Sequence, residues 1–349
     1  MKKLQVTGLT VPLFSVLIAL FFGGVMIAIQ GINPLLAYEV LFTKAFGSVD
    51  GIAATLSKAT PLILSGLAVA ICLRAGLFNI GAQGQLISGA LASAWAGYYF
   101  VGIPTFIHIP LALLFGATFG ALVALIAGAL KAYRGVHEVI TTIMLNSMVI
   151  AMADYLASTP FKEPDQPLTR TPAIQDSARI PDLFGLPFGF FIAVTFSIAL
   201  WWLLKNTTTG FRIETIGRNR HAGWYAGISV KRVIVLSMLV GGAVAGTAGA
   251  IETLSITGRF EPAFNAGLGF DGITVALLGR ANPIGVIPAA ILIGGMRAAG
   301  TTVQFRTGVS PEIVDLLLAL ILFFVTAPIL ARLLKRRHDG VSLTSGWSN

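Results

Sequence analysis

Amide side chains gather in one short stretch of an otherwise apolar chain. Asn79, Gln83 and Gln85 lie close together in 73–86, LRAGLFNIGAQGQL, a few residues after Arg74. An amide both donates and accepts hydrogen bonds, so these groups suit a neutral polar solute. They supply no nucleophile and no general base. The stretch therefore predicts polar recognition rather than covalent chemistry.

The sequence lacks the motifs of catalysis, ATP binding and metal binding. It contains no G-x-x-x-x-G-K-[ST] loop for nucleotide phosphates, and no recognisable Ser/His/Asp or Cys/His arrangement. Its four histidines are scattered without metal-ligand spacing. The single cysteine, Cys72, cannot form an intramolecular disulfide. We therefore expect no catalytic site, no metal and no cofactor.

The composition predicts an all-α integral membrane protein. The chain is 55% hydrophobic and 11% charged, whereas soluble domains carry about 25% charged residues. The segments 109–130 and 233–251 run 22 and 19 residues without a charge, and roughly 20 apolar residues span a bilayer as a helix. The net charge of +9 comes from short loops between apolar runs, which indicates a lipid bilayer rather than nucleic acid as the partner.

About ten transmembrane or partly spanning helices are predicted in a single transmembrane domain over residues 1–349. The segments are 11–30, 60–73, 80–102, 109–130, 137–157, 187–204, 233–256, 268–279, 284–298 and 312–334. Three of them (60–73, 268–279 and 284–298) are too short for a simple crossing and are expected to be broken, tilted or re-entrant. With a cytoplasmic N-terminus, most Lys and Arg fall inside and both termini are cytoplasmic.

Two loops stand out by composition. The predicted external loop, 158–186, contains five prolines, so it is either a semi-rigid platform or a plain connector. The predicted cytoplasmic loop, 205–232, has six basic residues and one acidic residue, and it carries Trp224 and Tyr225. This loop either lies on anionic lipid or docks into a groove of a soluble partner as a coupling loop.

The two halves of the chain share a short pattern. Residues 73–81, LRAGLFNIG, and 277–285, LLGRANPIG, both place an Asn followed by Ile-Gly near an Arg. Paired broken segments in two related halves of a transporter indicate its pathway. In the predicted topology both stretches face the same side of the membrane.

Glycine pairs with a spacing of four predict close helix packing. They occur at Gly116 and Gly120, and again at Gly242 and Gly246. Because glycines are abundant here, we assign these pairs to packing alone.

Four motifs in order resemble one known family: 74-RAGLFNIGAQGQ-85, 136-VHEVITTIMLN-146, 217-GRNRHAGWYAGI-228 and 269-GFDGITVALLGRANPIGVI-287. The chain resembles the permease subunit of a bacterial ABC importer of the branched-chain amino acid/ribose type. Within that type it is most similar to the nucleoside subgroup, whose members are also described as simple-sugar permeases. The resemblance covers nearly the whole chain.

The resemblance implies a multi-pass protein of the bacterial cytoplasmic (inner) membrane. Its expected partners are a second permease subunit (a hetero- or homodimer), one or more ATP-binding cassette subunits and an extracytoplasmic substrate-binding protein. The expected ATPase-coupling residues are Arg218, Asn219, Arg220, Trp224, Tyr225 and Gly227. The expected substrate-pathway residues are Asn79, Gln83, Gln85, Asn146 and Asn282.

Two questions stay open at the level of sequence. The stretch 73–86 either lines the translocation path or is a cytoplasmic turn that packs against its neighbours and caps them. The leading function is nucleoside import driven by ATP on a separate chain. The alternatives are a simple-sugar (ribose-type) importer, an ion-coupled secondary carrier, and a receptor or scaffold without transport.

Overall fold

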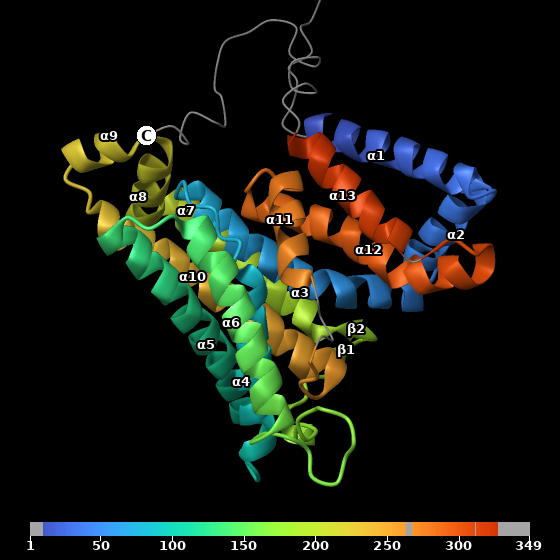
Figure 1. Cartoon of the computed structure of the whole chain (residues 1–349), viewed down its shortest axis with the longest axis horizontal. Helices are drawn as coiled ribbons and strands as arrows, with labels where there is room; N and C mark the ends of the chain where they lie inside the picture. Colours follow the sequence, from blue (N-terminus) through green and yellow to red (C-terminus); the bar gives the residue numbers. More distant parts are fainter. Residues whose placement is uncertain (1–9, 263–266, 311, 327–349) are drawn as a thin grey trace, which may run out of the picture.

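A computed structural model of the chain describes residues 10–262, 267–310 and 312–326, and in this part the chain is almost entirely helical (Figure 1). The α-helices are α1 (Thr10–Ile29), α2 (Pro34–Phe46), α3 (Val49–Arg74), α4 (Ala82–Tyr99), α5 (Thr105–Arg134), α6 (Glu138–Ser158), α7 (Phe188–Asn206), α8 (Thr208–Arg218), α9 (Arg220–Tyr225), α10 (Val230–Ile251), α11 (Leu268–Leu278), α12 (Pro283–Thr307) and α13 (Glu312–Thr326). The remaining elements are a 3₁₀ turn, η1 (Asp176–Ala178), a π-helical turn, η2 (Glu252–Thr257), and an antiparallel hairpin of β1 (Asp182–Leu183) and β2 (Leu186–Pro187).

Seven helices of the described chain are long and apolar enough to cross a membrane. They are α1, α3, α5, α6, α7, α10 extended through η2, and α12. The predicted short segment 268–279 is confirmed, because α11 has 11 residues. The last predicted span, 312–334, is described only as far as Thr326, and both chain termini lie outside the described residues.

Two other segments predicted to be short are full-length helices. The segment 60–73 belongs to α3, which has 26 residues and begins at Val49 after the N-cap Ser48. The N-terminal part of this helix contains Asp50 and Lys58. Because the prediction relied on apolar runs, it missed this charged part of the helix.

The segment 284–298 belongs to α12, which has 25 residues. This helix continues past Arg297, whose guanidinium lies 2.5 Å from an Asp271 carboxylate oxygen and 3.3 Å from one of Asp315. Ion pairing lets a charged residue sit within an apolar bundle, because an unpaired charge there is costly. The sequence reading also missed α2, which begins at Pro34 behind the N-cap Asn33.

The buried centre of the molecule consists of α3, α4 and α10 (Figure 1). On one side α5 packs against α4 and α10, and α6 covers α4; on the other side α11 and α12 pack against α3. Outside this centre, α2 lies on α12, while α1 and α13 pack against each other. Because neighbouring helices enclose α4, its amide side chains are shielded from lipid.

Both predicted glycine pairs lie where α5 meets α10. A Cβ atom at Gly246 would overlap the Gly116 carbonyl oxygen, and one at Gly120 would overlap the carbonyl oxygen of Gly242. Without side chains at these positions the two backbones come into direct contact. The predicted packing role is therefore confirmed.

The two long loops lie at opposite ends of the bundle (Figure 1). Residues 159–187 connect α6 to α7 at one end, and the helices α8 and α9 form the other end. The first loop is tied to the body of the molecule: the Ile180 amide donates to the Leu254 carbonyl at 3.0 Å, and Glu163 pairs with Arg259 at 3.0 Å. These bonds favour the platform interpretation of the loop over a plain connector.

Candidate functional site

The two similar stretches of the chain meet at the α8–α9 end. Arg74 is the last residue of α3, and its Nε donates to the Ala281 carbonyl at 2.8 Å. This bond joins the end of α3, directly before the turn that leads into α4 (residues 75–81), to the turn between α11 and α12 (residues 279–282). Both stretches therefore lie at the same end of the molecule, and the side of the membrane on which they lie stays a prediction.

The first of these turns leads into a buried pair of amides. Asn79 Nδ2 donates to Gln85 Oε1 at 3.0 Å, and Gln85 Nε2 donates back to Asn79 Oδ1 at 3.1 Å. Asn79 Oδ1 also accepts from the backbone amide of Gly81 at 3.1 Å. Both side chains are fully buried, so each satisfies the other where an unpaired amide would be costly.

Two further predicted amides connect α4 to its neighbours. Gln83 Oε1 accepts from the Gly269 amide at 2.7 Å. Asn146 on α6 accepts from the Gly84 amide at 2.8 Å through Oδ1 and donates to the Ile80 carbonyl at 3.0 Å through Nδ2. The first N–H groups of a helix lack intrahelical partners. Asn146 supplies such a partner at the start of α4, and Gln83 supplies one at the start of α11.

We call Asn79, Gln83, Gln85 and Asn146 the amide cluster. All four residues are buried in this conformation, so a solute could contact them only if α4, α6 and α11 moved apart. The stretch 73–86 does not follow a short, broken segment as the prediction for 60–73 implied, because α3 runs without interruption from Val49 to Arg74 and a turn joins it to α4. The hydrogen bonds favour the capping interpretation of the stretch, and the pathway role stays a prediction.

The fifth predicted pathway residue, Asn282, has a different environment. It is exposed, and its side chain caps α12 by accepting from the Ile284 amide at 3.2 Å. No described hydrogen bond joins it to the amide cluster. The similarity between 73–81 and 277–285 thus reflects two turns that precede helices, at which the two asparagines have different partners.

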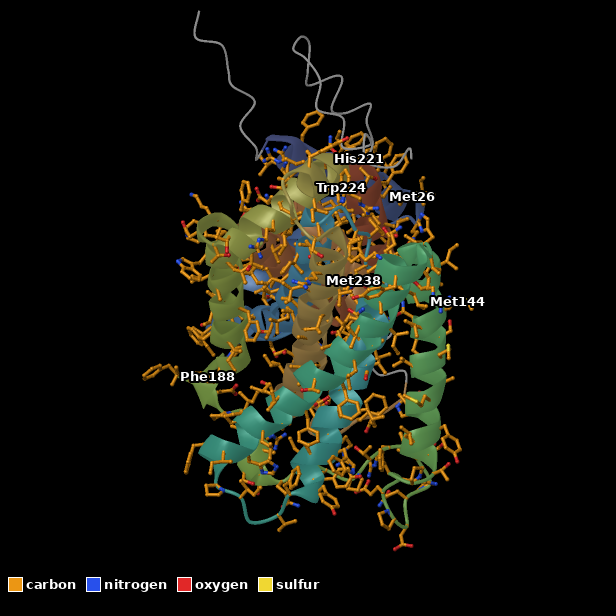
Figure 2. All side chains as sticks on the ribbon, turned by 90° about the vertical axis from the view of Figure 1, so that its left-hand side faces the viewer. Met26, Met144, Phe188, His221, Trp224 and Met238 are labelled. Carbon is orange, nitrogen blue, oxygen red and sulfur yellow. The ribbon has the colours of Figure 1, made fainter. Side chains whose placement is uncertain are left out.

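The predicted coupling loop folds into two short helices rather than one. Thr207 caps α8, and Asn219 ends that helix and caps α9 by accepting from the Ala222 amide at 3.1 Å. On α9 the rings of Trp224 and Tyr225 meet edge to face, with centroids 5.1 Å apart. They are 66% and 82% exposed, and Figure 2 shows Trp224 at this end of the molecule.

The other predicted coupling residues flank the aromatic pair in the sequence. The side chain of Arg218 is 83% exposed and lies 3.9 Å from Glu214. Arg220 Nη2 donates to the Gly76 carbonyl at 3.3 Å, so this residue touches the turn between α3 and α4. Gly227 follows α9 with a φ of +74°, a backbone conformation that favours glycine.

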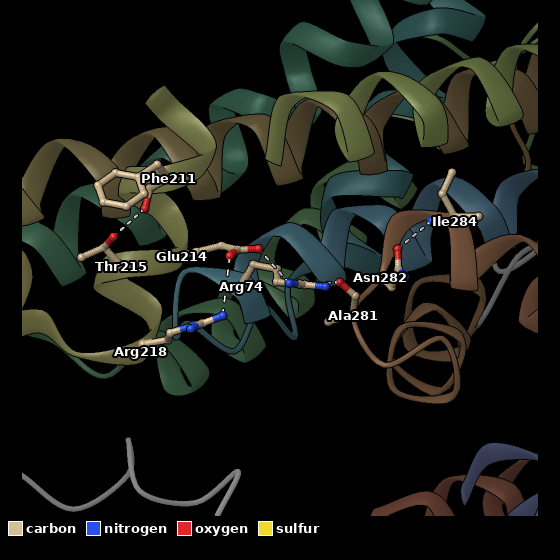
Figure 3. A network of polar contacts seen from close by, with 8 residues as sticks. All are labelled: Arg74, Phe211, Glu214, Thr215, Arg218, Ala281, Asn282 and Ile284. Carbon is tan, nitrogen blue, oxygen red and sulfur yellow. Dashed lines mark hydrogen bonds and ion pairs between the residues drawn. The ribbon is translucent and has the colours of Figure 1, made fainter. Parts of the chain in front are cut away.

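The structure adds two residues to those predicted, Arg74 and Glu214. Arg74 Nη1 donates to Glu214 Oε1 at 2.8 Å, while its Nε holds the carbonyl of Ala281, as Figure 3 shows. One signal could have identified Glu214, because it is the one acid among six bases in 205–232. The partner of that acid could not be inferred, since 140 positions separate the two residues.

Comparison with known proteins identifies a family and several relatives of this chain. A family model described as branched-chain amino acid transport system / permease component matches residues 51–326. The guanosine ABC transporter permease protein NupP of Bacillus subtilis (strain 168) is 39% identical over 335 residues, covering 93% of this chain and 94% of the relative. The nucleoside ABC transporter permease protein NupB of Lactococcus lactis subsp. cremoris (strain MG1363) is 36% identical, covering 90% of each chain.

A third relative has a different printed substrate. The glucose ABC transporter permease protein TsgB13 of Haloferax volcanii is 34% identical, covering 95% of this chain and 90% of the relative. All three similarities extend over nearly the full length of both proteins. The chain therefore belongs to the family of branched-chain amino acid transport system permease components, and it is a helical, multi-pass membrane protein that serves as a transport component rather than an enzyme.

Proposed function

We propose that the chain is the membrane-spanning permease subunit of an ATP-driven importer that moves nucleosides across the bacterial cytoplasmic membrane. One observation carries the proposal. The relatives NupP and NupB, named for guanosine and nucleoside transport, are 39% and 36% identical to this chain over nearly its whole length. The absence of a phosphate-binding loop from the sequence fits a subunit whose ATPase is a separate polypeptide.

The proposed orientation places the α8–α9 end in the cytoplasm and residues 158–186 outside. The excess of basic residues in 205–232 supports it, since loops rich in Lys and Arg stay on the cytoplasmic side. About ten segments then cross or partly cross the membrane, in two related halves, and both termini are cytoplasmic. The position of the two similar stretches, each leading directly into a helix (α4 and α12), supports the relation between the halves.

The proposed partners bind at the two ends. An ATP-binding cassette subunit docks on α8–α9, where Trp224 and Tyr225 present adjoining aromatic surface that no described part of the chain covers. Aromatic anchors of this kind often dominate the energy of an interface. A substrate-binding protein meets the platform at 158–186, and a second permease subunit completes the membrane part.

The proposed substrate contacts are the amides of Asn79, Gln83, Gln85 and Asn146. A nucleoside is a neutral solute with many hydrogen-bonding groups, and amides match both its donors and its acceptors. Because these side chains bond to protein in the present conformation, they would exchange partners when the surrounding helices separate. Asn282 would act from the second turn.

A simple-sugar importer is the second candidate. Its support is the 34% identity to the glucose permease TsgB13 over 95% of this chain. The two candidate functions require the same fold and the same kinds of partner subunit, so they differ only in the solute that is transported.

Competition for uptake separates the two candidates. Vesicles containing the chain together with its partner subunits are loaded with ATP, and uptake of labelled guanosine is measured against an excess of unlabelled nucleosides, ribose or glucose. We expect nucleosides to suppress uptake and sugars to leave it unchanged. Labelled ribose or glucose accumulating in the same vesicles, with no uptake of nucleosides, would support the sugar importer instead.

A further inference from the structure

We propose that Arg74 is the positioning residue that transmits a displacement of α8–α9 to both ends of the short helix α11. The inference rests on the proposed docking of an ATPase on α8–α9. It assigns a role to a side chain that contacts neither ATP nor solute, and that acts by joining three segments of the chain.

The guanidinium of Arg74 bridges α8 and the turn between α11 and α12. It donates to Glu214 of α8 through Nη1 and to the Ala281 carbonyl through Nε, both at 2.8 Å (Figure 3). Its side chain and that of Glu214 are each about one-third exposed, at 32%. A guanidinium is planar and rigid, so two bonds from one group fix the relative positions of their acceptors.

The backbone at the end of α3 also lies directly against α8. A Cβ atom at Gly217 would overlap the carbonyl oxygen of Arg74. One turn further along, Arg220 of α9 donates to the Gly76 carbonyl at 3.3 Å. The α8–α9 segment is thus in contact with the end of α3 through both backbone and side chains, so a movement of the segment toward α3 would displace Arg74.

The turn that Arg74 holds on its other side has an unusual backbone. Arg280 and Ala281 are consecutive residues with φ values of +56° and +51°, a left-handed conformation that residues other than glycine seldom adopt. Such a conformation persists where its surroundings impose it. The Ala281 amide donates to the Ala276 carbonyl at 2.7 Å, and Arg74 binds the carbonyl of the same residue. Loss of the Arg74 bond would release one of these constraints.

A second connection between Arg74 and α11 runs through Gln83 of the amide cluster. Residues 75–81 lead directly from Arg74 into α4, where Gln83 accepts from the Gly269 amide in the first turn of α11 at 2.7 Å. The same α11 is followed by the turn that Arg74 binds. This 11-residue helix is therefore held near its start by Gln83 and just beyond its end by Arg74. A movement of α8–α9 would reach both positions.

The test measures the ratio of solute transported to ATP hydrolysed by the complete complex in proteoliposomes. We compare Arg74→Lys and Glu214→Gln with the unaltered protein. Lysine keeps the charge but cannot place two fixed donors at once, and glutamine removes the charge of the partner. We expect each change to lower the transport ratio about fivefold or more, the lower end of typical coupling between sites, while ATP hydrolysis and subunit assembly remain.

Arg134→Gln is the matched control, because it removes an exposed arginine at the end of α5, outside α8–α9 and outside the turns beside Arg74, and it should leave the ratio unchanged. The double variant Arg74→Lys with Glu214→Gln should be no worse than the poorer single variant, since one contact is lost in both.

Two results would overturn the inference alone: an unchanged transport ratio in both single variants, or a loss of uptake that only matches a loss of assembly and of melting temperature. If the unaltered complex shows no ATP-dependent nucleoside uptake, the proposed function fails, and the inference fails with it.

Discussion

Asn79 and Gln85 show how amides are accommodated inside a helical membrane protein. Each satisfies the other at 3.0 and 3.1 Å, and Asn146 serves the N–H group of Gly84 at the start of α4. These contacts stabilise the junction of α3, α4 and α6 in the present conformation. A residue that caps a helix in one conformation can still bind solute in another, so stability and transport have to be measured together.

Asn79→Ala should destabilise the protein because it leaves the buried Gln85 amide without its reciprocal partner. An unsatisfied buried polar group costs about 1–3 kcal/mol, and we expect a lower melting temperature of the purified protein. Asn282→Ala is the control, because that side chain is exposed and bonds only to the Ile284 amide in the described structure; its loss should cost no more than an ordinary N-cap.

Uptake measured on the same Asn79→Ala variant tests the pathway role. If the side chain binds solute, uptake should fall unequally for different nucleosides, and by more than the loss of stability explains. A uniform loss that follows the melting temperature would leave only the capping role. An unchanged melting temperature would contradict the importance of the amide pair.

The sequence predicted that Asn79, Gln83 and Gln85 need hydrogen-bond partners inside the protein, but it could not identify those partners. Amides between apolar segments must find hydrogen-bond partners, because lipid offers none. The pairing of Asn79 with Gln85 crosses a turn and follows no helical period, and the partners Gly269 and Asn146 come from other helices. Tertiary contacts of this kind leave little trace in a single sequence.

Among the elements, the helices whose apolar runs are unbroken were predicted best. The predicted span 11–30 corresponds to α1, and the predicted span 187–204 to α7. The starts or ends of α3 and α12 were missed, because charged residues such as Lys58 and Arg297 lie within them. Length and apolarity identify a membrane helix only where no ion pair or neighbouring helix shields its polar part.

Gly246→Ala should disrupt the contact between α5 and α10. Its new Cβ atom would overlap the Gly116 carbonyl oxygen, and overpacking of this kind costs about 1–3 kcal/mol. Gly24→Ala is the matched control in α1, where the nearest atoms to a new Cβ lie at 3.4 Å or more. Melting temperature and yield should fall for Gly246→Ala alone, and equal behaviour of the two variants would contradict the described packing.

The aromatic pair on α9 allows a test of the coupling segment that is separate from stability. Trp224→Ala and Tyr225→Ala remove exposed rings, so the melting temperature of the isolated chain should not change. Binding to the ATPase subunit should weaken by more than about 1 kcal/mol for at least one of them, as for anchor residues of interfaces. Arg218→Ala, an exposed change on the neighbouring helix α8, should have less effect.

Co-purification of the subunits and the rate of ATP-driven uptake provide the two measurements for these variants. If both aromatic variants assemble and transport normally, the α9 surface does not dock the ATPase. The segment would then be one that lies on the membrane surface, the alternative that its basic, amphipathic sequence also allows.

At the scale of the whole molecule, the two ends of the bundle differ in charge and in structure. The α8–α9 end has exposed aromatic rings and the basic stretch 205–232, while the opposite end carries a loop tied down by Glu163 and Arg259. Composition alone predicted a helical membrane protein, and four short motifs predicted the family. The arrangement of helices around α3, α4 and α10 could not be predicted, because it depends on contacts between distant segments.

The most direct test of the proposed transport function is the energy source for nucleoside uptake. Proteoliposomes contain the chain with its ATPase and second permease subunits; ATP is sealed inside, and labelled guanosine and the substrate-binding protein are added outside. We predict accumulation that requires internal ATP and that stays unchanged when sodium and proton gradients are dissipated. Accumulation driven by an imposed ion gradient in the absence of ATP would contradict the account and indicate an ion-coupled carrier.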